Sequence, residues 1–484
     1  MAATVESLTT EYGQVLAGMR ATFRTGKTQS LAWRRQQLEQ LHLMHAENHE
    51  AMTAAVRQDL GGPKLRGLAE LAGAAGADHM LDHLEEYTSE KWVGGWIHRQ
   101  CVRPEPKGVM LIIAPWNFPI LLCLHPLAPA IAAGNMVVIK PSEMSPTTSQ
   151  LLKTLVAKYM DNDCIKVIEG AKDETTALLN LQWDHIMYTG NTQVGRIVMT
   201  AAAKHLTPVT LELGGKSPVI VDESAQLDAT CARVAFAKWL NCGQICVAPD
   251  YVLVHESKEQ EFLKRTKDII KSSYGDSKES PDYGRIVNER HVDRLQSLIE
   301  TAGGNVICGG VDGIDRTDRF IPPTVISQPK LDAPIMQNEI FGPVLPVLSY
   351  KTLDAALAMV KGQETPLALY VFSETSKNVE KVLQECPSGG SCVNSSLEQL
   401  GGENMPFGGK GPSGMGCYHG KFGFDEFSHY RSVLRKSTLP LFRGPFAPLP
   451  SAKNPTPEFV YNLAIKITLG VLPRGLKALM RRFP

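Results

Sequence analysis

The uncharged stretch GVMLIIAPWNFPILLCLHPLAPAIAAGNMVVI, residues 108–139, decides how this chain folds. It carries no formal charge unless His125 is protonated, and it is long enough to cross a bilayer. Prolines at positions 115, 119, 126 and 129 would break both a continuous spanning helix and a single long strand. We therefore interpret the stretch as a buried strand, a turn and a helix inside a globular domain.

Short aliphatic runs separated by helix-compatible segments continue this pattern along the chain. A first series of such runs occupies residues 109–113, 136–139, 165–168, 185–188 and 209–213. This spacing is typical of βαβ units and of a buried parallel sheet. A second series, at 218–221, 251–254 and 367–372, predicts a second α/β domain. The first hundred residues have apolar positions at helical spacing and predict an outer layer of helices.

The bulk composition limits what the protein can be. The chain has 484 residues, of which 43% are hydrophobic, enough for two or three domains with substantial cores. Fifty Lys and Arg balance fifty Asp and Glu, so the net charge does not indicate a nucleic-acid partner. The ten cysteines are irregularly spaced, which indicates reduced thiols in a reducing compartment. No cleavable signal begins the chain, and we expect a cytoplasmic protein.

Two glycine motifs look like nucleotide-binding loops but lack the context. Gly409, Gly411 and Gly414 have the Gly-x-Gly-x-x-Gly spacing, yet no strand precedes them and no helix can open behind them. The run GGKS at 214–217 would end a phosphate-binding P-loop, but Thr210 stands where its first glycine is required. We therefore do not interpret either motif as a cofactor site.

Six short blocks resemble the aldehyde dehydrogenase superfamily in their order and spacing. They are APWNFP at 114–119, YTGNTQVG at 188–195, LELGGKSP at 211–218, NCGQIC at 241–246, NEIFGP at 338–343 and PFGG at 406–409. The resemblance covers roughly residues 10–435, and GCYHGK at 416–421 is more like the class 3 and fatty aldehyde dehydrogenase branch. It implies an α/β fold with a Rossmann-like parallel-sheet cofactor domain, a second α/β catalytic domain and a small dimerisation element.

The same resemblance divides the chain. We expect an NAD(P)-binding domain at 1–212 with a dimerisation hairpin near 88–107, a catalytic domain at 213–415, a return segment at 416–440, and a proline-rich arm with an amphipathic tail at 441–484. The apolar part of that tail is too short and too interrupted to span a bilayer. It is expected to lie on an anionic membrane, to cover the substrate entrance, or to dock on its own or a partner subunit.

The resemblance assigns the nucleophile to Cys246. A thiol with a pKa of about 8.5 is partly ionised at neutral pH, so Cys246 would add to an aldehyde carbonyl and form a thiohemiacetal. The side-chain amide of Asn117 and the backbone N–H of Cys246 would stabilise the oxyanion. Hydride transfer would leave a thioester, and Glu212 would deprotonate the water that hydrolyses it.

Each of these residues has a simpler interpretation when taken alone. Cys246 has apolar neighbours and would then be a packing thiol, Asn117 a helix cap, and Glu212 a solvated charge at a strand end. Cys242 lies four residues before Cys246 and leaves a disulfide between them open. No histidine or second cysteine pair lies nearby, so we predict no metal site.

The cofactor site is also assigned by the resemblance. Gly190 and Gly195 bracket a strand-to-helix turn, and a helix beginning near Thr192 would offer free N–H groups to the dinucleotide phosphates. Lys140 and Glu143 are assigned to the adenosine ribose, and the carboxylate of Glu143 favours NAD while leaving NADP open. The other assigned residues are Trp116, Asn191, Glu339 at the nicotinamide ribose, and Phe341 beside the nicotinamide.

From these residues we expect an NAD(P)-dependent homodimeric enzyme that oxidises medium- to long-chain aliphatic, or aromatic, aldehydes to carboxylic acids. Its partner is a small-molecule aldehyde, without nucleic acid, and a peripheral membrane contact through the tail stays open beside the two other placements of the tail. One alternative is a coenzyme A-acylating dehydrogenase, which a water-activating Glu212 argues against. The other is a nucleotide-binding scaffold without activity, which the joint presence of Cys246, Asn117 and Glu212 argues against.

Overall fold

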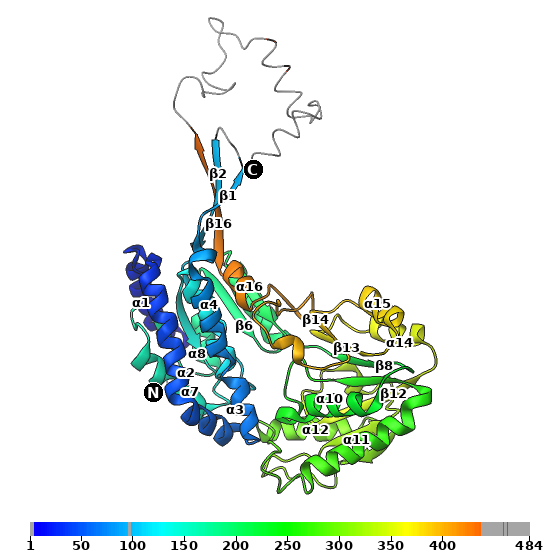
Figure 1. Cartoon of the computed structure of the whole chain (residues 1–484). Coiled ribbons are helices and arrows are strands. Elements are labelled where there is room, and N and C mark those ends of the chain that lie inside the picture. Colours follow the sequence, from blue (N-terminus) through cyan, green and yellow to red (C-terminus); the bar gives the residue numbers. More distant parts are fainter. Residues whose placement is uncertain (1–3, 95–97, 437–457, 459–461, 463–484) are drawn as a thin grey trace, which may run out of the picture. The chain divides into compact units, whose positions relative to one another are not determined.

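The structure, a computed structural model, describes residues 4–94 and 98–436 together with Glu458 and Asn462 (Figure 1). The chain divides into two compact units. Unit 1 comprises Met1–Leu84 and Pro106–Phe427, and unit 2 comprises Glu85–Glu105 and Ser428–Pro484. Apart from Glu458 and Asn462, the predicted arm and tail at 441–484 lie outside the described residues.

Unit 1 contains the predicted parallel sheet. Its strands are β3 (Val109–Ile113), β4 (Met136–Lys140), β5 (Ile165–Val167), β6 (His185–Thr189), β7 (Val209–Glu212) and β15 (Gly414–Met415). Their order is β15-β7-β6-β3-β4-β5, and only β15 runs antiparallel to its neighbour among the described strands. Counted from β3, the parallel strands have the 3-2-1-4-5 order of a dinucleotide-binding sheet. The chain reverses its winding between β3 and β6, where such sheets bind ligands at their carboxyl ends.

A second, mixed sheet in unit 1 contains the other predicted series of strands. It consists of β8 (Pro218–Val221), β9 (Tyr251–His255), β10 (Asn305–Cys308), β11 (Thr324–Ser327), β12 (Val344–Tyr350), β13 (Ala368–Phe372) and β14 (Gly390–Val393). Their order is β10-β11-β12-β9-β8-β13-β14, and only β10 runs antiparallel among the described strands. All eight predicted strands begin and end within one residue of the prediction. The predicted fold class, α/β with two parallel-sheet domains, is confirmed.

Helices cover the faces of both sheets, as parallel strands buried on both sides require. The helices that precede β8 in the chain are α1 (Val5–Arg24), α2 (Leu31–Leu60), α3 (Lys64–Glu70), α4 (Ala72–Thr88), α5 (Leu121–Leu124), α6 (Leu127–Ala133), α7 (Pro146–Tyr159), α8 (Lys172–Leu179) and α9 (Thr192–Ala203). Those that follow β8 are α10 (Leu227–Trp239), α11 (Glu259–Tyr274), α12 (Glu289–Glu300), α13 (Pro334–Gln337), α14 (Leu353–Lys361), α15 (Ser376–Glu385) and α16 (Gly420–Glu426). Short 3-10 helices are η1 (Lys27–Gln29), η2 (Leu240–Gly243), η3 (Glu256–Lys258) and η4 (Glu398–Leu400).

The uncharged stretch at 108–139 folds as strand, turn, two short helices and strand. Every residue of β3 and β4 is buried, and the chain turns back after α6 at Gly134, whose φ of 89° suits glycine. The interpretation of this stretch as globular core is therefore confirmed. None of the described helices combines the length and the apolar character that crossing a membrane requires.

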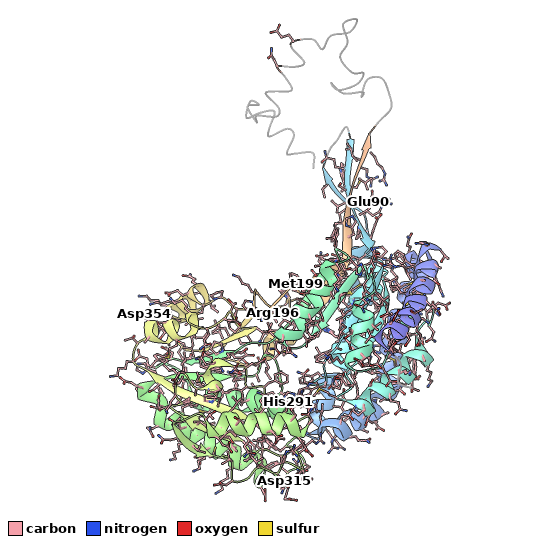
Figure 2. All side chains as sticks on the ribbon, turned by 180° about the vertical axis from the view of Figure 1, so that it is seen from behind. Glu90, Arg196, Met199, His291, Asp315 and Asp354 are labelled. Atoms are coloured by element: carbon pink, nitrogen blue, oxygen red, sulfur yellow. The ribbon has the colours of Figure 1, made fainter. Side chains whose placement is uncertain are left out.

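Unit 2 contains a three-stranded sheet in the order β1-β2-β16, formed by β1 (Lys91–Gly94), β2 (His98–Pro106) and β16 (Ser428–Lys436). Glu90, labelled in Figure 2, accepts hydrogen bonds from Arg435 and Arg103. The pKa of Glu90 is lowered to about 2, mainly by Arg435 and further by Arg103. The dimerisation role of the hairpin near 88–107 stays a prediction.

We expect Leu111→Ala to destabilise unit 1. Leu111 is fully buried in β3, between β4 and β6, so removing its side chain leaves a cavity that costs about 2–5 kcal/mol. Leu331→Ala is the control because Leu331 is 54% exposed. Denaturant unfolding followed by tryptophan fluorescence measures both, and equal midpoints for the two variants would contradict the assignment of β3 to the core.

Candidate active site

Cys246 lies at the end of a tight loop that follows α10. Within η2, Asn241 and Cys242 both have a φ of 52°, which non-glycine residues rarely adopt. A Cβ on Gly243 would lie 2.2 Å from the carbonyl oxygen of Gly342, so this turn requires glycine. Backbone strain of this kind persists only where surrounding contacts hold it.

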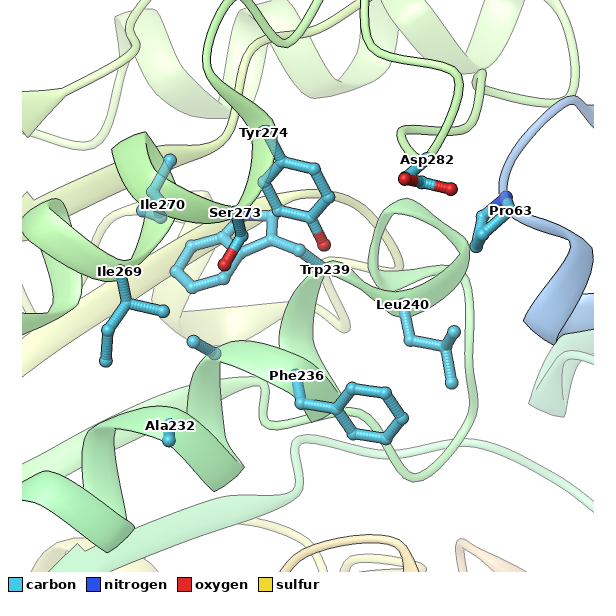
Figure 3. Close-up of a pocket in the computed structure, with 11 residues that line it drawn as sticks. Pro63, Ala232, Phe236, Trp239, Leu240, Ile269, Ile270, Ser273, Tyr274 and Asp282 are labelled. Carbon is cyan, nitrogen blue, oxygen red and sulfur yellow. The ribbon is translucent and has the colours of Figure 1, made fainter.

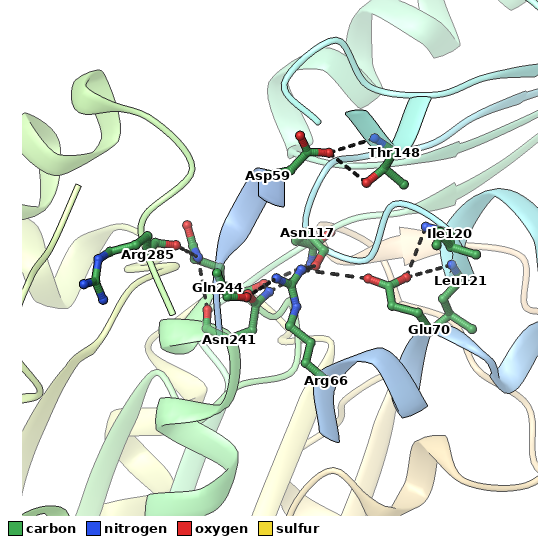
Figure 4. Close-up of polar contacts among 11 residues, drawn as sticks. Asp59, Arg66, Glu70, Asn117, Ile120, Leu121, Thr148, Asn241, Gln244 and Arg285 are labelled. Carbon is green, nitrogen blue, oxygen red and sulfur yellow. Dashed lines mark hydrogen bonds and ion pairs between the residues drawn. The ribbon is translucent and has the colours of Figure 1, made fainter. Parts of the chain in front are cut away.

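The buried side chain of Gln244 holds this loop (Figure 4). Its Nε2 donates to the carbonyl oxygens of Asn241, at 3.1 Å, and Arg285, at 3.0 Å. Its Oε1 accepts from the N–H of Val287 at 3.0 Å. Gln244 lies inside the NCGQIC block, where the sequence alone indicates no role for it. Its role is to fix the backbone two residues before Cys246.

Asn117 joins this loop to the turn after β3 (Figure 4). Its Nδ2 donates to the carbonyl oxygen of Gln244 at 3.0 Å. Its own carbonyl oxygen accepts from Asn241 Nδ2 at 3.1 Å and from Arg66 Nη2 at 2.7 Å. An amide nitrogen carries two hydrogens, so Asn117 retains one donor for a ligand. Its amide nitrogen, the donor the sequence analysis assigned to the oxyanion, thus points to the loop that carries Cys246.

A buried ion pair that the sequence analysis missed supports Asn117. Arg66 Nη2 lies 3.8 Å from Glu70 Oε1, and both side chains are almost fully buried. Glu70 Oε2 accepts from the N–H groups of Ile120, at 3.1 Å, and Leu121, at 2.9 Å. Burial raises the pKa of Glu70 to about 7, against the lowering effect of Arg66 and these two N–H groups. The only sequence signal was an i,i+4 pair of opposite charges in α3, which usually lies on a helix surface.

Glu212 ends β7 as a buried carboxyl without partners. Its side chain is 1% exposed, and neither oxygen has a hydrogen-bond partner. Burial first, and the charge of Glu426 second, raise the pKa of Glu212 well above its ordinary value. The simpler interpretation, a solvated charge at a strand end, is therefore wrong. A buried, unpaired carboxyl is rare, and a carboxyl whose pKa is raised in this way is a candidate catalytic group.

The thiol of Cys246 is not ionised at neutral pH, contrary to our expectation from its ordinary pKa. Burial raises this pKa to about 12, and the negative charges of Glu339 and Glu212 raise it further. The backbone N–H groups of Cys246 and Val247 only partly oppose this. The physical cause is that the loop leaves the thiol only partly exposed to water and places two carboxyls near it. Cys246 must therefore pass its proton to a base when it reacts.

Cys242 does not share the environment of Cys246. Cys242 is buried close to Gly284, where an added Cβ would lie 3.3 Å from its sulfur. All ten cysteines lie in described residues and are free thiols, so the structure contains no bridge between Cys242 and Cys246.

An anchored loop carries Glu339 and Phe341. Lys216 Nζ pairs with Asp250 and donates to the carbonyl oxygens of Ile335, at 2.7 Å, and Asn338, at 2.9 Å. Asp250 Oδ2 accepts from the N–H of Ile340 at 2.9 Å. Lys216 therefore has a structural role in the motif that only looked like a P-loop.

The side chains of Glu339 and Phe341 pack against residues that follow β7 and β3. Burial, then the charge of Asp250, raise the pKa of Glu339 to about 8. A Cβ on Gly214 would lie 2.2 Å from Glu339 Oε2, so the carboxyl packs directly on the backbone that follows β7. The ring of Phe341 meets that of Trp116 edge-on at 5.5 Å. The loop thus places both residues beside the carboxyl ends of β7 and β3.

The residues assigned to the adenosine half of the cofactor lie at the same edge of the first sheet. Lys140 ends β4, and its Nζ donates to the carbonyl oxygen of Gly170 at 2.9 Å and to Glu143 Oε2 at 3.3 Å. The side chain of Glu143 is 48% exposed. A carboxylate that is held yet accessible suits the hydroxyl groups of a ribose.

The turn between β6 and α9 needs its glycines. A Cβ on Gly190 would lie 2.2 Å from Tyr188 Oη, and one on Gly195 would lie 2.7 Å from Leu213 Cδ2. The side chain of Asn191 caps α9 by accepting from the N–H of Val194 at 2.9 Å. The other N–H groups of the first turn have no partner within the helix, and they suit a phosphate. Arg196 and Met199 lie further along α9 (Figure 2).

An apolar pocket of about 470 Å³ opens next to the residues that precede the nucleophile loop (Figure 3). Its lining includes Phe236, Trp239 and Leu240 from α10 and η2, and Ile269 and Ile270 from α11. A second pocket, of about 360 Å³, shares Phe236 and includes Leu397. The side chain of Phe236 is 50% exposed, so an aromatic ring stands between two apolar hollows.

Comparison with known proteins gives one family. The sequence pattern of the aldehyde dehydrogenase family matches residues 2–433. Aldehyde dehydrogenase family 3 member A2 of Rattus norvegicus is 45% identical over 86% of this chain and 87% of its own length. The 4,4'-diaponeurosporen-aldehyde dehydrogenase of Staphylococcus aureus is 41% identical over 88% of this chain and 96% of its own length.

Solved structures show the same fold. The substrate-bound state of Staphylococcus aureus AldH has a TM-score of 0.88 and 39% identity, covering 95% of this chain and 99% of that one. A Mycobacterium tuberculosis aldehyde dehydrogenase complexed with NAD+ has a TM-score of 0.81 and 27% identity, covering 90% and 92%.

The raised pKa of Cys246 predicts how the enzyme without cofactor responds to iodoacetamide. Alkylation needs the thiolate, so the inactivation rate should rise about tenfold per pH unit from pH 7 to 9 without levelling off. Mass spectrometry of the quenched enzyme identifies the alkylated cysteine, and Cys246→Ser controls for the other thiols. A plateau below pH 8 would contradict a Cys246 pKa of about 12.

Proposed function

This chain belongs to the aldehyde dehydrogenase family, and we propose that it oxidises aldehydes to carboxylic acids through a thioester on Cys246. The observation that carries this proposal is the buried, unpaired carboxyl of Glu212. Its charge raises the pKa of Cys246, so the two groups share one electrostatic environment. A thiol and an unpaired base form the set that acyl transfer to water needs.

The first half of the reaction forms the thioester. Cys246 loses its proton to a neighbouring carboxylate, and its sulfur adds to the aldehyde carbon. Glu212 can take this proton because neither of its carboxyl oxygens has a hydrogen-bond partner. The remaining N–H of the Asn117 amide donates to the oxyanion, a contact worth roughly 2.7–4 kcal/mol. NAD(P), when bound, accepts the hydride of that carbon.

The second half hydrolyses the thioester. Glu212 takes a proton from a water molecule, whose oxygen attacks the acyl carbon while the sulfur of Cys246 leaves. Because the pKa of Glu212 is raised, it is a stronger base than an exposed glutamate. The arrangement therefore favours water over coenzyme A as the acyl acceptor.

The cofactor residues fit NAD(P). Lys140 and Glu143 would hold the adenosine ribose, and the first turn of α9 after Gly190 and Asn191, with Gly195 close against β7, would meet the phosphates. Glu339 would hold the nicotinamide ribose, with Trp116 and Phe341 beside the ring. The carboxylate of Glu143 disfavours a 2′-phosphate, so we propose a preference for NAD.

Medium- to long-chain aldehydes fit the apolar pockets on both sides of Phe236. Burying a methylene group is worth about 0.8 kcal/mol, so such walls favour longer chains. A homodimer is proposed because a relative 44% identical in Rattus norvegicus is named a dimeric NADP-preferring aldehyde dehydrogenase. We also propose that the protein is located in the cytoplasm. Its tail would lie on a membrane, at the substrate entrance or on a subunit.

Glu212→Gln should separate the two halves of the reaction. We expect a burst of about one NADH per site followed by slow turnover, because the thioester forms but water is not activated. Stopped-flow absorbance at the NADH band measures both phases. Undiminished steady-state hydrolysis would remove Glu212 from this role, and a coenzyme A ester as the main product of the wild type would favour the acylating alternative.

Phe236→Ala should weaken the selectivity for long chains. We expect the ratio of kcat/KM for hexadecanal to that for acetaldehyde to fall about tenfold, since only the long chain reaches this ring. Leu331→Ala removes an equally exposed apolar side chain elsewhere and should leave the ratio unchanged. Equal ratios in both variants would show that the alkyl chain lies outside these pockets.

A further inference from the structure

A chain of polar side chains on the first sheet has no part in the reaction described above. Thr210 Oγ1 donates to Glu426 Oε1 at 2.6 Å. His185 Nε2 lies 2.8 Å from Thr210 Oγ1, and its Nδ1 lies 3.1 Å from Lys107 Nζ. Thr210 and His185 are fully buried, whereas Glu426 and Lys107 are half-buried. The chain therefore joins two partly exposed charges through a buried centre.

The direction of these hydrogen bonds follows from the donors present. A lysine ammonium only donates, so His185 Nδ1 accepts from Lys107 and the ring carries its hydrogen on Nε2. That N–H donates to Thr210 Oγ1, which leaves the hydroxyl hydrogen for Glu426. Burial lowers the pKa of His185 well below its ordinary value, so the ring stays neutral. Every donor in the chain thus points toward Glu426, whose Oε1 accepts the last of these hydrogen bonds.

Glu426 is held on the side of the sheet where Glu212 lies. Thr210 and Glu212 are two residues apart in β7 and share one face, at a spacing of about 7 Å. A Cβ on Gly416 would lie 2.7 Å from Glu426 Oε1 and 2.9 Å from Thr210 Cγ2, so glycine there leaves room for this contact. The charge of Glu426 reaches the carboxyl of Glu212, whose pKa it raises. The unpaired carboxyl of Glu212 and the hydrogen-bonded carboxyl of Glu426 therefore lie near enough for the charge of one to act on the other.

We propose that Glu426 is the acceptor that takes the proton from Glu212 after thioester hydrolysis and passes it to solvent, and that Lys107, His185 and Thr210 position its carboxylate. This inference rests on the proposed role of Glu212 as the base. Enzymes whose general base is buried need such an exit, because each turnover leaves the base protonated.

The proton balance is complete. Glu212 first passes the proton that it took from Cys246 to Glu426, before water reacts. Water then gives a second proton to Glu212 as its oxygen bonds to the acyl carbon, and the carbon–sulfur bond breaks to give the acid and the Cys246 thiolate, which takes the proton of the acid and becomes a thiol again. Glu212 then passes the second proton to the carboxylate of Glu426, directly or through one water molecule. Glu426, which is half-exposed, releases it to bulk water. Thr210 keeps its own hydrogen throughout and holds Glu426 in place.

The test compares Glu426→Gln with Asp425→Asn in the full-length enzyme. Asp425 is the neighbouring residue in α16 and pairs with Lys421, so its variant removes a charge from the same helix. We expect Glu426→Gln to retain the NADH burst and to lower steady-state turnover by about tenfold or more, while Asp425→Asn stays near the wild type. Adding imidazole should restore turnover in Glu426→Gln, because a small base can take the proton from Glu212.

Thr210→Val and Thr210→Ser supply a second comparison that tests positioning. The serine variant keeps the hydroxyl donor and should retain turnover, whereas the valine variant should behave like Glu426→Gln. Thermal unfolding of all variants checks that they are folded. Wild-type turnover in Glu426→Gln, or a loss of both burst and turnover that imidazole does not restore, would overturn the proposal.

The same assays distinguish this proposal from the function on which it rests. If Glu212→Gln hydrolyses the thioester normally, the proposed function fails whatever Glu426→Gln does. If Glu212→Gln is slow and Glu426→Gln is normal, only the proton exit is wrong.

Discussion

The hydrogen bond from the Asn117 side chain to the Gln244 carbonyl is the contact on which the candidate active site depends. It joins the turn at the carboxyl end of β3 to the loop that follows α10, and so connects two parts of the chain 127 residues apart. Leaving such a buried group unpaired costs about 1–3 kcal/mol. Here the carbonyl oxygens of Asn117 and Gln244 are paired, by the side chains of Asn241 and Arg66 and of Asn241 and Asn117 respectively. The network thereby fixes both the oxyanion donor and the backbone that carries Cys246.

Carboxyls determine the chemistry that this frame allows. Glu212 and Glu339 lie close enough to Cys246 to raise its pKa, and burial raises the pKa of all three groups. In the resting site, Cys246, Glu212 and Glu339 therefore hold their protons more tightly than the same groups would in water. This suppresses a free thiolate and makes Glu212 a stronger base. A site of this kind needs a route by which protons leave, and Glu426 is a nearby, partly exposed carboxyl that Thr210 holds in place.

The eight strands that the sequence predicted are continuous aliphatic runs, as fully buried parallel strands should be, and β3 and β4 are examples. The sequence did not predict four strands of the second sheet, β10, β11, β12 and β14. The candidate site residues were predicted from short motifs, and the structure shows why glycine is needed within two of them, at Gly190 and Gly243. The ionisation of Cys246 was predicted wrongly, because a pKa depends on burial and on charges brought together by folding.

The supporting residues could not be read from the sequence for the same reason. Arg66 and Glu70 resemble a surface ion pair until the fold buries them beside Asn117. His185 and Thr210 are ordinary strand residues. Thr210 donates a hydrogen bond to Glu426, which lies 216 positions later in the chain. Local spacing identifies groups on one helix or strand, whereas these contacts join distant segments.

If Cys246 is the nucleophile, its sulfur carries the acyl group during turnover. Rapid quenching of the wild-type enzyme during turnover of a long-chain aldehyde with NAD, followed by peptide mass spectrometry, tests it directly. Fragmentation separates Cys246 from Cys242 on their shared peptide. We predict the mass of the acyl group on Cys246 alone, and its absence from Cys246 during turnover, or its presence on another residue, would contradict the account.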